Sequence, residues 1–278
     1  MYTSLLKGIC WTQWSIAALC LLAGVLMVVP AAFSAEKRTA ISPAPRGEAF
    51  LPGEALTYNI SWSKAVKAGT AVMEVRGEEL PDGREVLRFI VTSRTEGIMG
   101  RVYPLGDTVQ SVFDLKLMQS LSYTLEARHG KRTRRREMVF DHANRKVVSR
   151  VNDDPPTTLD IPAKAQDTLS AFYYLRTRND FAVDRPMIIE VFDGRTSRSI
   201  EVLTMGREKV KTPAGEFNTI KIKASGGIFL GEGEVLVWLT DDSRKVPVRI
   251  KSSVAIGSIV FTLKDLRSGQ VITRPRAE

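Results

Sequence analysis

Histidine and cysteine, which often carry out catalysis or bind metals, are scarce in this chain of 278 residues. The chain contains two histidines, His129 and His142, and two cysteines, Cys10 and Cys20. His129 lies at the expected tip of a hairpin and His142 in an expected turn, both in hydrophilic segments where a solvated histidine is typical. No paired-histidine helix motif, Gly-x-Ser-x-Gly elbow or lysine-containing phosphate loop occurs. The sequence therefore predicts no catalytic residue, no cofactor and no enzymatic activity.

Two carboxylate pairs, Asp153-Asp154 and Asp241-Asp242, are the remaining candidates for acid–base chemistry. Each pair stands beside proline or serine in an expected turn, whereas general acid–base catalysis needs two carboxylates in different environments. Solvated turns are therefore the favoured interpretation. A calcium site would need further oxygen ligands at suitable spacing, and none is present. We expect no metal site, and a hydrolase that acts on envelope polymers through carboxylates alone is the least favoured function.

The densest positive charge lies in one short segment of a chain that has 40 basic and 31 acidic residues. Its basic members are Arg128, Lys131, Arg132, Arg134, Arg135 and Arg136. On a strand, every second residue from Arg132 onward shares a face with Met138 and Phe140. This phase predicts a hairpin that leaves the core and extends its tip into water.

Such a basic hairpin has two interpretations. One is a finger that binds anionic lipid head groups, lipopolysaccharide phosphates or an acidic partner protein. The other is a solubilising strand edge that blocks aggregation. Nucleic acid is not an expected partner, because no base-stacking aromatic residues alternate with the arginines.

The elements that would position these residues are mainly strands, because apolar and polar residues alternate with period two through most of the chain. Tyr58, Ile60 and Trp62 share one face of such a strand. Turn residues such as Asp193-Gly194 separate the runs by short gaps, which favours antiparallel hairpins. About a dozen strands exceed what a flat twisted sheet usually holds. We therefore predict an all-β fold, built as a strongly curved antiparallel sheet or an open β-barrel.

One segment, residues 167–178, departs from the strand pattern. It begins at a capping residue, Asp167, and then places Leu169, Phe172 and Tyr173 at helical spacing. We expect a single short helix here, which plugs or covers the curved sheet.

Seven apolar residues are candidates to line a ligand pocket inside such a sheet. The four aromatic members, expected on an inward stripe, are Tyr58, Trp62, Phe89 and Tyr123. The other three stand between glycines and are Ile228, Phe229 and Leu230. The stripe either lines a pocket or fills it, and the second group is either a mobile lip at a cavity mouth or part of the core.

Residues 1–35 contain the three parts of a secretory signal peptide: basic Lys7, an apolar core from Ile16 to Val29, and small residues after it. The part of residues 1–35 that follows Lys7 carries no charge and is also long enough to span a bilayer, which takes about 20 apolar residues. An uncleaved inner-membrane anchor is therefore the alternative. A lipoprotein signal is disfavoured, because Leu19 precedes Cys20 where a small residue is needed. In either case we expect the rest of the chain to be periplasmic.

The other boundaries follow from composition. We expect a flexible lead-in over residues 36–50, a single all-β domain over 51–267 and a C-terminal tail over 268–278. Both cysteines lie in the signal segment, so the domain has no thiol for disulfides, catalysis or cysteine–metal sites. Its core must therefore hold it together.

Four stretches stand in a characteristic order along the chain. They are Pro52–Trp62 with Ala68–Ala71, then Asp167–Arg176, Val210–Phe217 and Val237–Val248. Taken together, from about Phe50 to Leu266, they resemble bacterial envelope proteins called the domain of unknown function 3108 family. The resemblance implies an exported, mostly β protein with no assigned activity and no known catalytic residues.

These features lead to two functional hypotheses. The first is a non-enzymatic periplasmic envelope protein that binds a lipid or other lipophilic small molecule in a β-barrel-like pocket. The alternative is a structural or adaptor protein of the envelope. It would bind a protein partner or an anionic membrane surface through a strand edge and the arginine-rich hairpin.

Overall fold

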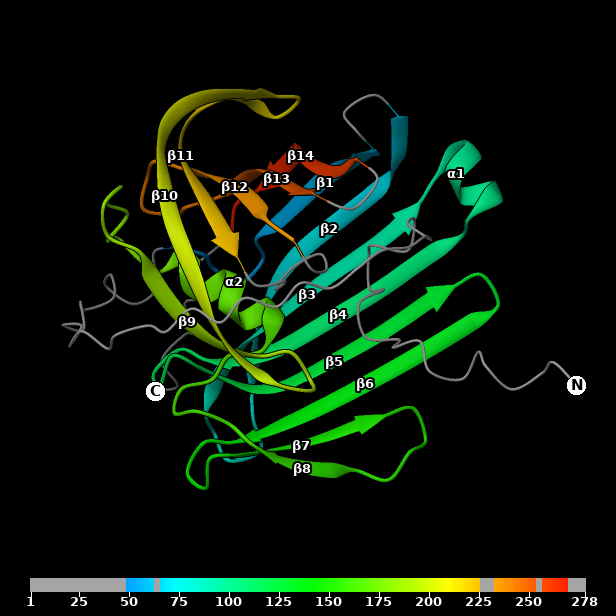
Figure 1. The fold of residues 1–278 in the computed structure, drawn as a ribbon, viewed down its shortest axis with the longest axis vertical. Helices are drawn as coiled ribbons and strands as arrows, with labels where there is room; N and C mark the ends of the chain where they lie inside the picture. Colours follow the sequence, from blue (N-terminus) through cyan, green and yellow to red (C-terminus); the bar gives the residue numbers. More distant parts are fainter. Residues whose placement is uncertain (1–48, 63–65, 226–232, 254–256, 270–278) are drawn as a thin grey trace, which may run out of the picture.

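The computed structural model describes residues 49–62, 66–225, 233–253 and 257–269. These residues form one antiparallel sheet of 14 strands, which curves strongly without closing into a barrel (Figure 1). The strands are β1 Ala55–Trp62, β2 Val66–Glu79, β3 Glu85–Thr95, β4 Leu105–Asp114, β5 Gln119–His129, β6 Arg132–Asp141, β7 Lys146–Val151, β8 Thr157–Asp160, β9 Met187–Phe192, β10 Ser197–Thr212, β11 Gly215–Ser225, β12 Val235–Thr240, β13 Pro247–Ser253 and β14 Ser258–Arg267.

Period-two alternation accounts for these strands. In β1, Leu56, Tyr58 and Ile60 are buried, while the residues between them are only partly covered. Tight turns join neighbouring strands, as at Gly194 between β9 and β10, where φ is +93°. The predicted fold class is confirmed, with 14 strands in the described part of the chain where about a dozen were expected.

The two ends of the described chain meet in the middle of the sheet. The strand order is β8-β7-β6-β5-β4-β3-β2-β1-β14-β13-β12-β11-β10-β9, so the first and last strands are neighbours. Their register pairs Ala55 with Arg267 and Trp62 with Ile259. Each of the other neighbouring pairs consists of strands consecutive in sequence. The free edges of the sheet are therefore β8 and β9, which precede and follow the helical segment.

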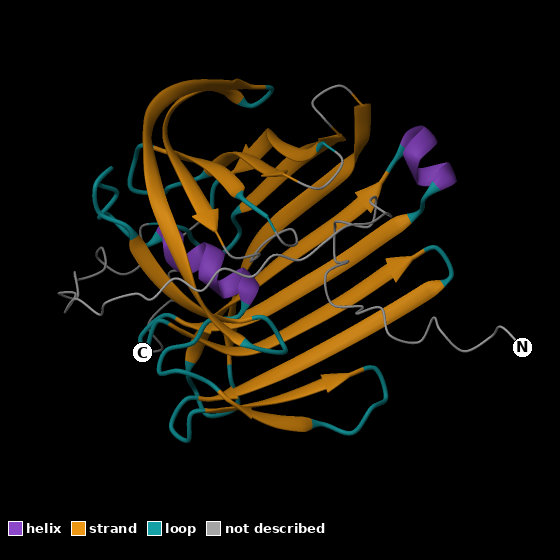
Figure 2. Ribbon diagram, viewed as in Figure 1, coloured by secondary structure: helices purple, strands orange, loops and turns teal. Residues whose placement is uncertain are grey.

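Two helices occur in the described residues, α1 (Gly97–Val102) and α2 (Thr168–Arg176). The second is the predicted helix, and it lies inside the curve of the sheet (Figure 2). Most of its residues are buried. The sequence interpretation missed α1, which joins β3 to β4, because six residues that include two glycines carry no helical period.

Aromatic packing joins α2 to the concave face of the sheet. Tyr173 stacks on Phe89 of β3, with ring centroids 3.7 Å apart and planes 4° from parallel. Phe50 packs edge-on against both rings, at centroid distances of 5.2 Å from Tyr173 and 5.3 Å from Phe89. Aromatic pairs of this kind contribute about 0.5–1.5 kcal/mol beyond the area they bury. The helix thus forms part of the core that the sheet encloses.

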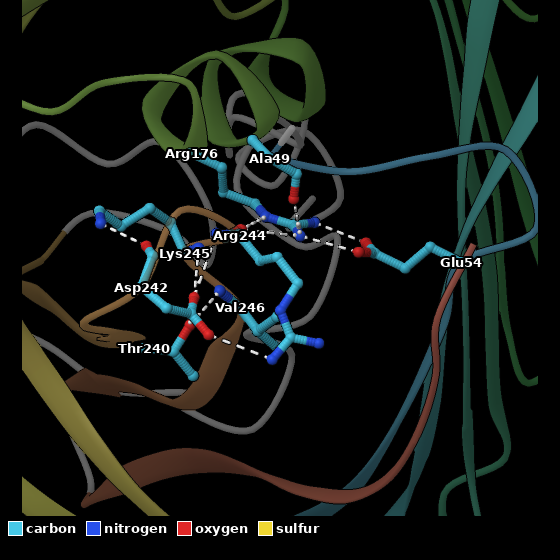
Figure 3. A network of polar contacts seen from close by, with 8 residues as sticks. All are labelled: Ala49, Glu54, Arg176, Thr240, Asp242, Arg244, Lys245 and Val246. Atoms are coloured by element: carbon cyan, nitrogen blue, oxygen red, sulfur yellow. Dashed lines mark hydrogen bonds and ion pairs between the residues drawn. The ribbon is translucent and has the colours of Figure 1, made fainter. Parts of the chain in front are cut away.

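A buried ion pair fixes the carboxyl end of α2 (Figure 3). Arg176, whose side chain is fully buried, donates through Nη1 and Nη2 to the two carboxylate oxygens of Glu54, at 2.7 and 2.9 Å. The same guanidinium donates to the carbonyl oxygen of Ala49 at 2.8 Å and to that of Arg244 at 3.1 and 3.2 Å. The end of the helix is therefore tied to the start of β1 and to the turn between β12 and β13.

Asp242 shapes that turn so that its main chain reaches Arg176 (Figure 3). Its Oδ1 accepts hydrogen bonds from the Thr240 hydroxyl at 2.6 Å and from the Arg244 main-chain N–H at 3.1 Å. The Thr240 hydroxyl in turn accepts from the Val246 N–H at 2.9 Å. The turn is thus internally braced, which holds the acceptor carbonyl in place.

A buried carboxylate fixes the amino end of α2. Oδ1 of Asp167, the N-cap residue, accepts from the main-chain N–H groups of Leu169 and Ser170, each at 2.8 Å. Its Oδ2 accepts from the hydroxyls of Ser111, at 2.6 Å, and Ser120. These two serines belong to β4 and β5, so α2 is held to the sheet at both of its ends.

We predict that Arg176→Met lowers the free energy of unfolding by about 3–5 kcal/mol, because it leaves the Glu54 carboxylate buried without its counter-charge. The control is Arg76→Met. Arg76 pairs with Glu74 where the two side chains are 60% and 30% exposed, and such a pair contributes about 1 kcal/mol or less. Urea unfolding followed by circular dichroism measures both losses.

The double variant Glu54→Gln/Arg176→Met should recover part of the loss, since it removes the unpaired charge but leaves the carbonyls of Ala49 and Arg244 without their donor. Equal losses for Arg176→Met and Arg76→Met would contradict the role assigned to the buried pair.

Candidate functional site

Three of the predicted pocket residues, Tyr58, Phe89 and Tyr123, belong to the packed core. Tyr58 is buried and donates its hydroxyl hydrogen to the carbonyl oxygen of Pro247 at 2.7 Å. Phe89 is buried against Tyr173 of α2. Trp62, at the end of β1, is partly buried and packs on the same core. Tyr58 and Phe89, two members of the aromatic stripe, therefore pack against other groups of the protein.

Tyr123 lies on β5, where it pairs with Met138 of β6 and is buried near Arg134 and Arg136. Burial raises the pKa of its hydroxyl to about 12, and a hydrogen bond with Thr168 and the positive charges of Arg136 and Arg134 act against that rise. The remaining three candidates, which lie outside the described residues, are Ile228, Phe229 and Leu230.

The arginine-rich segment forms the β5–β6 hairpin, whose tip is Gly130-Lys131. Arg132, Arg134 and Arg136 lie on the same face of β6 as its buried residues, as the alternation predicted. Their burial increases along the strand: Arg132 is exposed, Arg134 is half-buried and Arg136 is buried. The other basic residues of the segment are exposed and are Arg128, Lys131 and Arg135.

Arg136 lies deeper than the other arginines of the segment, because only 6% of this residue is exposed. The curvature of the sheet accounts for the difference, since it brings the β9–β10 turn against β6. Nη1 of Arg136 donates to the carbonyl oxygen of Asp193 in that turn, at 2.8 Å. Gly194 leaves room for the contact, because a Cβ at this position would lie 2.3 Å from Nη1.

Three guanidinium groups gather here, and we call Arg134, Arg136 and Arg195 the arginine cluster. Burial, reinforced by the neighbouring charges of Arg134 and Arg195, lowers the pKa of Arg136 to about 10. Burial and the charge of Arg195 lower the pKa of Arg134 as well. These directions are those expected of like charges in a partly desolvated place. Nε of Arg136 is buried and has no hydrogen-bond partner in the described structure.

This arrangement is suited to binding an anion. Guanidinium groups present paired N–H donors that match the oxygens of a carboxylate or a phosphate. Arg195 is exposed and Arg134 half-buried, so the cluster opens to solvent on one side, while Arg136 forms its buried side. The alternation of β6 indicated which arginines share a face, but nothing in the sequence indicated that the β9–β10 turn would lie against β6 and complete the cluster.

Each histidine contacts a group that belongs to the fold, a main-chain carbonyl or a buried carboxylate. His142 Nε2 donates to the main-chain carbonyl oxygen of Ser120 at 2.6 Å, and the Ser120 hydroxyl donates to Asp167. A nucleophilic serine would need its hydroxyl, not its carbonyl, on the histidine. His129 Nε2 lies 3.0 Å from the buried carboxylate of Asp107. Neither contact has the geometry of a nucleophile and its base.

The carboxylate pairs occupy the turns where the sequence placed them. Asp153-Asp154 follows β7, and Asp241-Asp242 follows β12, where Asp241 pairs with Arg207 at 2.8 Å and Asp242 braces its own turn. In the described part of the chain, no group of three or more His, Cys, Asp and Glu residues is placed to hold a metal ion.

Of the helices that the structure describes, none has the length and apolar character needed to cross a bilayer.

The fold defines a class of protein: an open, strongly curved all-β sheet that holds a helix within its curve. The chain belongs to the family described as Protein of unknown function (DUF3108), whose model matches residues 57–264. The family predicted from the four sequence stretches is thereby confirmed. No curated protein sequence matches the chain.

Solved structures with a similar fold include a β-barrel-like protein of the domain of unknown function DUF1849 from Brucella abortus. It has a TM-score of 0.59 and 11% sequence identity, over 80% of this chain and 100% of that one. This similarity concerns the fold alone.

Two further matches have low TM-scores. A candidate lipoprotein from Parabacteroides distasonis gives 0.34 at 10% identity, over 81% of this chain and 97% of that one. A candidate exported protein from Bacteroides fragilis gives 0.32 at 14% identity, over 80% and 100%.

The buried N-cap carboxylate leads to a prediction about pH. Burial raises the pKa of Asp167 above its usual 3.8, against hydrogen bonds from Ser111, Ser120, Ser170 and Leu169 that lower it. The folded state then holds this proton more tightly than the unfolded state does, so the contribution of Asp167 to stability falls as the pH rises through and above about 3.8.

We therefore expect the free energy of unfolding of the native chain to decline relative to that of Asp167→Asn as the pH is raised from about 3 to about 7. Asparagine keeps an oxygen for the helix cap but does not titrate in this range. Urea midpoints measured across the range provide the test. A constant difference between the two proteins would contradict the assigned shift.

Proposed function

We propose that this chain is a non-enzymatic protein of the cell envelope, located outside the cytoplasm, which binds an amphipathic molecule with an acidic head group. The head group, a carboxylate or a phosphate, contacts the arginine cluster on the concave side of the sheet. The apolar part of the ligand lies along neighbouring apolar side chains. This proposal refines the lipophilic ligand expected from the sequence, because it assigns the ligand a charge and a place.

One observation carries the proposal: the buried guanidinium of Arg136 has an unpartnered Nε in the described structure and stands among other arginines. Burying a charge is costly unless hydrogen bonds and an opposite charge compensate it. The turn supplies one carbonyl oxygen, from Asp193. A carboxylate or phosphate would supply the missing acceptor, and its negative charge would add to that of the neighbouring Asp193 side chain.

The surroundings of Arg136 suit an apolar ligand tail. Met138 and Phe140 follow on the same face of β6 and are buried. Phe140 meets Phe192 of β9 edge-on, with ring centroids 6.4 Å apart. The apolar part of a ligand held by the arginine cluster would therefore lie next to the apolar core.

The edges of the sheet give less support to the alternative of an adaptor that docks by strand addition. Strand β8 has only four residues and follows Pro155-Pro156, and short, proline-flanked edges resist added strands. At the other edge, Gln166 pairs with β9. Its main-chain N–H donates to the carbonyl oxygen of Glu190, and its carbonyl oxygen accepts from the N–H of Phe192, each at 2.8 Å. Binding through side chains therefore remains the better supported mode.

The test uses the full chain and two probes, hexadecanoate and a single-chain lysophosphatidate, with hexadecanol as their uncharged counterpart. We expect the native protein to bind at least one acidic probe and to bind hexadecanol much more weakly. Arg136→Met should weaken binding of the acid about tenfold or more, since a hydrogen bond to a charged group contributes about 1.5–3 kcal/mol. Displacement of a fluorescent fatty acid measures each affinity, and the preferred acid distinguishes carboxylate from phosphate.

Arg198→Met is the matched control, because Arg198 lies near the same turn and pairs with Asp193 on the exposed side. It should bind the acid as the native chain does. Gly194→Ala offers an independent route, since its added methyl group would displace Arg136. Equal binding of acid by the native chain and Arg136→Met, or equal binding of acid and alcohol by the native chain, would overturn the proposal.

A further inference from the structure

A second surface lies at one end of the sheet, where α1 and the tip of the β5–β6 hairpin stand close together (Figure 1). The main-chain N–H of Gly130, in the hairpin tip, donates to the carbonyl oxygen of Pro104, just after α1, at 2.8 Å. In the register of β4 and β5, Leu105 pairs with His129. We call this end of the molecule, formed by residues 97–104 and 128–132, the cationic rim.

The apolar side chains of α1 are directed into solvent. No residue of the helix is buried, and Ile98 and Val102 are 78% and 75% exposed. Tyr103, which follows them, is 37% exposed. Exposed aliphatic side chains at this level are energetically unfavourable in water, and contiguous ones commonly mark an interaction site.

Local hydrogen bonds hold α1 in this position. The hydroxyl of Thr95 donates to the carbonyl oxygen of Tyr103 at 2.9 Å and accepts from the N–H of Leu105 at 2.9 Å. Gly100 packs closely on the same residue, because a Cβ there would lie 3.0 Å from the Thr95 carbonyl oxygen. The helix is thus braced against the end of β3, with its apolar residues pointing away from the sheet.

Positive charge surrounds these apolar residues. Arg101 lies within α1, and Arg128 and Lys131 on the hairpin are also exposed. Two neighbouring carboxylates are already engaged, and the first, Glu96, pairs with Lys67 at 3.5 Å and Arg94 at 3.2 Å. The carboxylate of Asp107 is buried and pairs with His129.

The acidic turn Asp153-Asp154 is set back from the rim. Asn152, just before it, bonds to the carbonyl oxygen of Arg135 at 2.8 Å, which places the turn along β6 and away from the hairpin tip. The exposed charge of the rim itself is therefore positive.

We propose that the cationic rim docks on an anionic lipid bilayer, with Ile98, Val102 and Tyr103 entering the head-group region. Basic residues near a membrane attract anionic lipids, and a tyrosine ring suits the interface between head groups and acyl chains. A stable protein interface needs about 800 Å² from each partner, which the two side chains of the six-residue helix α1 and Tyr103 after it do not provide. A bilayer accepts an insertion of this size. The proposal is independent of the ligand assigned to the arginine cluster.

The experiment places a reporter on α1 in the full chain. Cys10 and Cys20 are replaced by serine, and Val102→Cys is labelled with a fluorophore that shifts to shorter wavelength in an apolar environment. A label at this position reports on α1 itself, whatever residues 1–35 do. The matched control is Val183→Cys, because this valine is also strongly exposed, at 61%, in the loop after α2.

Vesicles of phosphatidylglycerol should shift the label at position 102 and leave the label at 183 unchanged, and vesicles of phosphatidylcholine should shift neither. Arg101→Glu/Lys131→Glu should raise the phosphatidylglycerol concentration needed for half the shift by about tenfold or more, since each reversed charge removes an attraction and adds a repulsion. Circular dichroism checks that each variant is folded.

Three outcomes would overturn the proposal. The label at 102 could fail to respond to phosphatidylglycerol, respond no more than the label at 183, or shift equally with both lipids. A shift produced by an acidic protein such as α-lactalbumin, but not by vesicles, would assign the rim to a protein partner.

Discussion

The buried pair of Arg176 and Glu54 is the contact on which the rest of the structure depends. A sheet of 14 strands that does not close leaves its concave side uncovered, and α2 covers part of it only if both helix ends are held. Arg176 holds one end through a carboxylate and two main-chain carbonyls, and Asp167 holds the other through two serines. The stacked rings of Phe89 and Tyr173 follow from that placement.

Arg136 and Arg176, the two buried arginines among the described residues, differ in a way that separates stability from function. Every donor nitrogen of Arg176 has an acceptor, and its partners lie on three different segments. Arg136 has one carbonyl acceptor, an unpartnered Nε in the described structure, and like charges beside it. An arginine of the first kind stabilises a fold, whereas one of the second kind lowers stability in the absence of a ligand. This contrast makes the arginine cluster the stronger candidate for binding.

Sequence patterns predicted what is local in this molecule. Alternation identified the strands, the helical spacing identified α2 with its cap at Asp167, and the phase of β6 placed Arg136 on the inward face. Contacts between distant segments carried no such pattern. Glu54 is separated from Arg176 by most of the chain, and the turn at Asp193 meets β6 only because the sheet curves. The helix α1 was missed because six residues are too few to establish a period, and with it the apolar part of the cationic rim.

The pairing of β1 with β14 has a consequence for how the chain reaches this state. Ala55 and Arg267 are partners in the register, so the centre of the described sheet is completed by β14, which follows its other 13 strands in the sequence. Until that strand arrives, β1 presents an unpaired edge in the middle of the future sheet, and such edges promote aggregation. Contacts this distant in sequence also slow folding. The β1 edge therefore stays open to unwanted pairing until β14 is available.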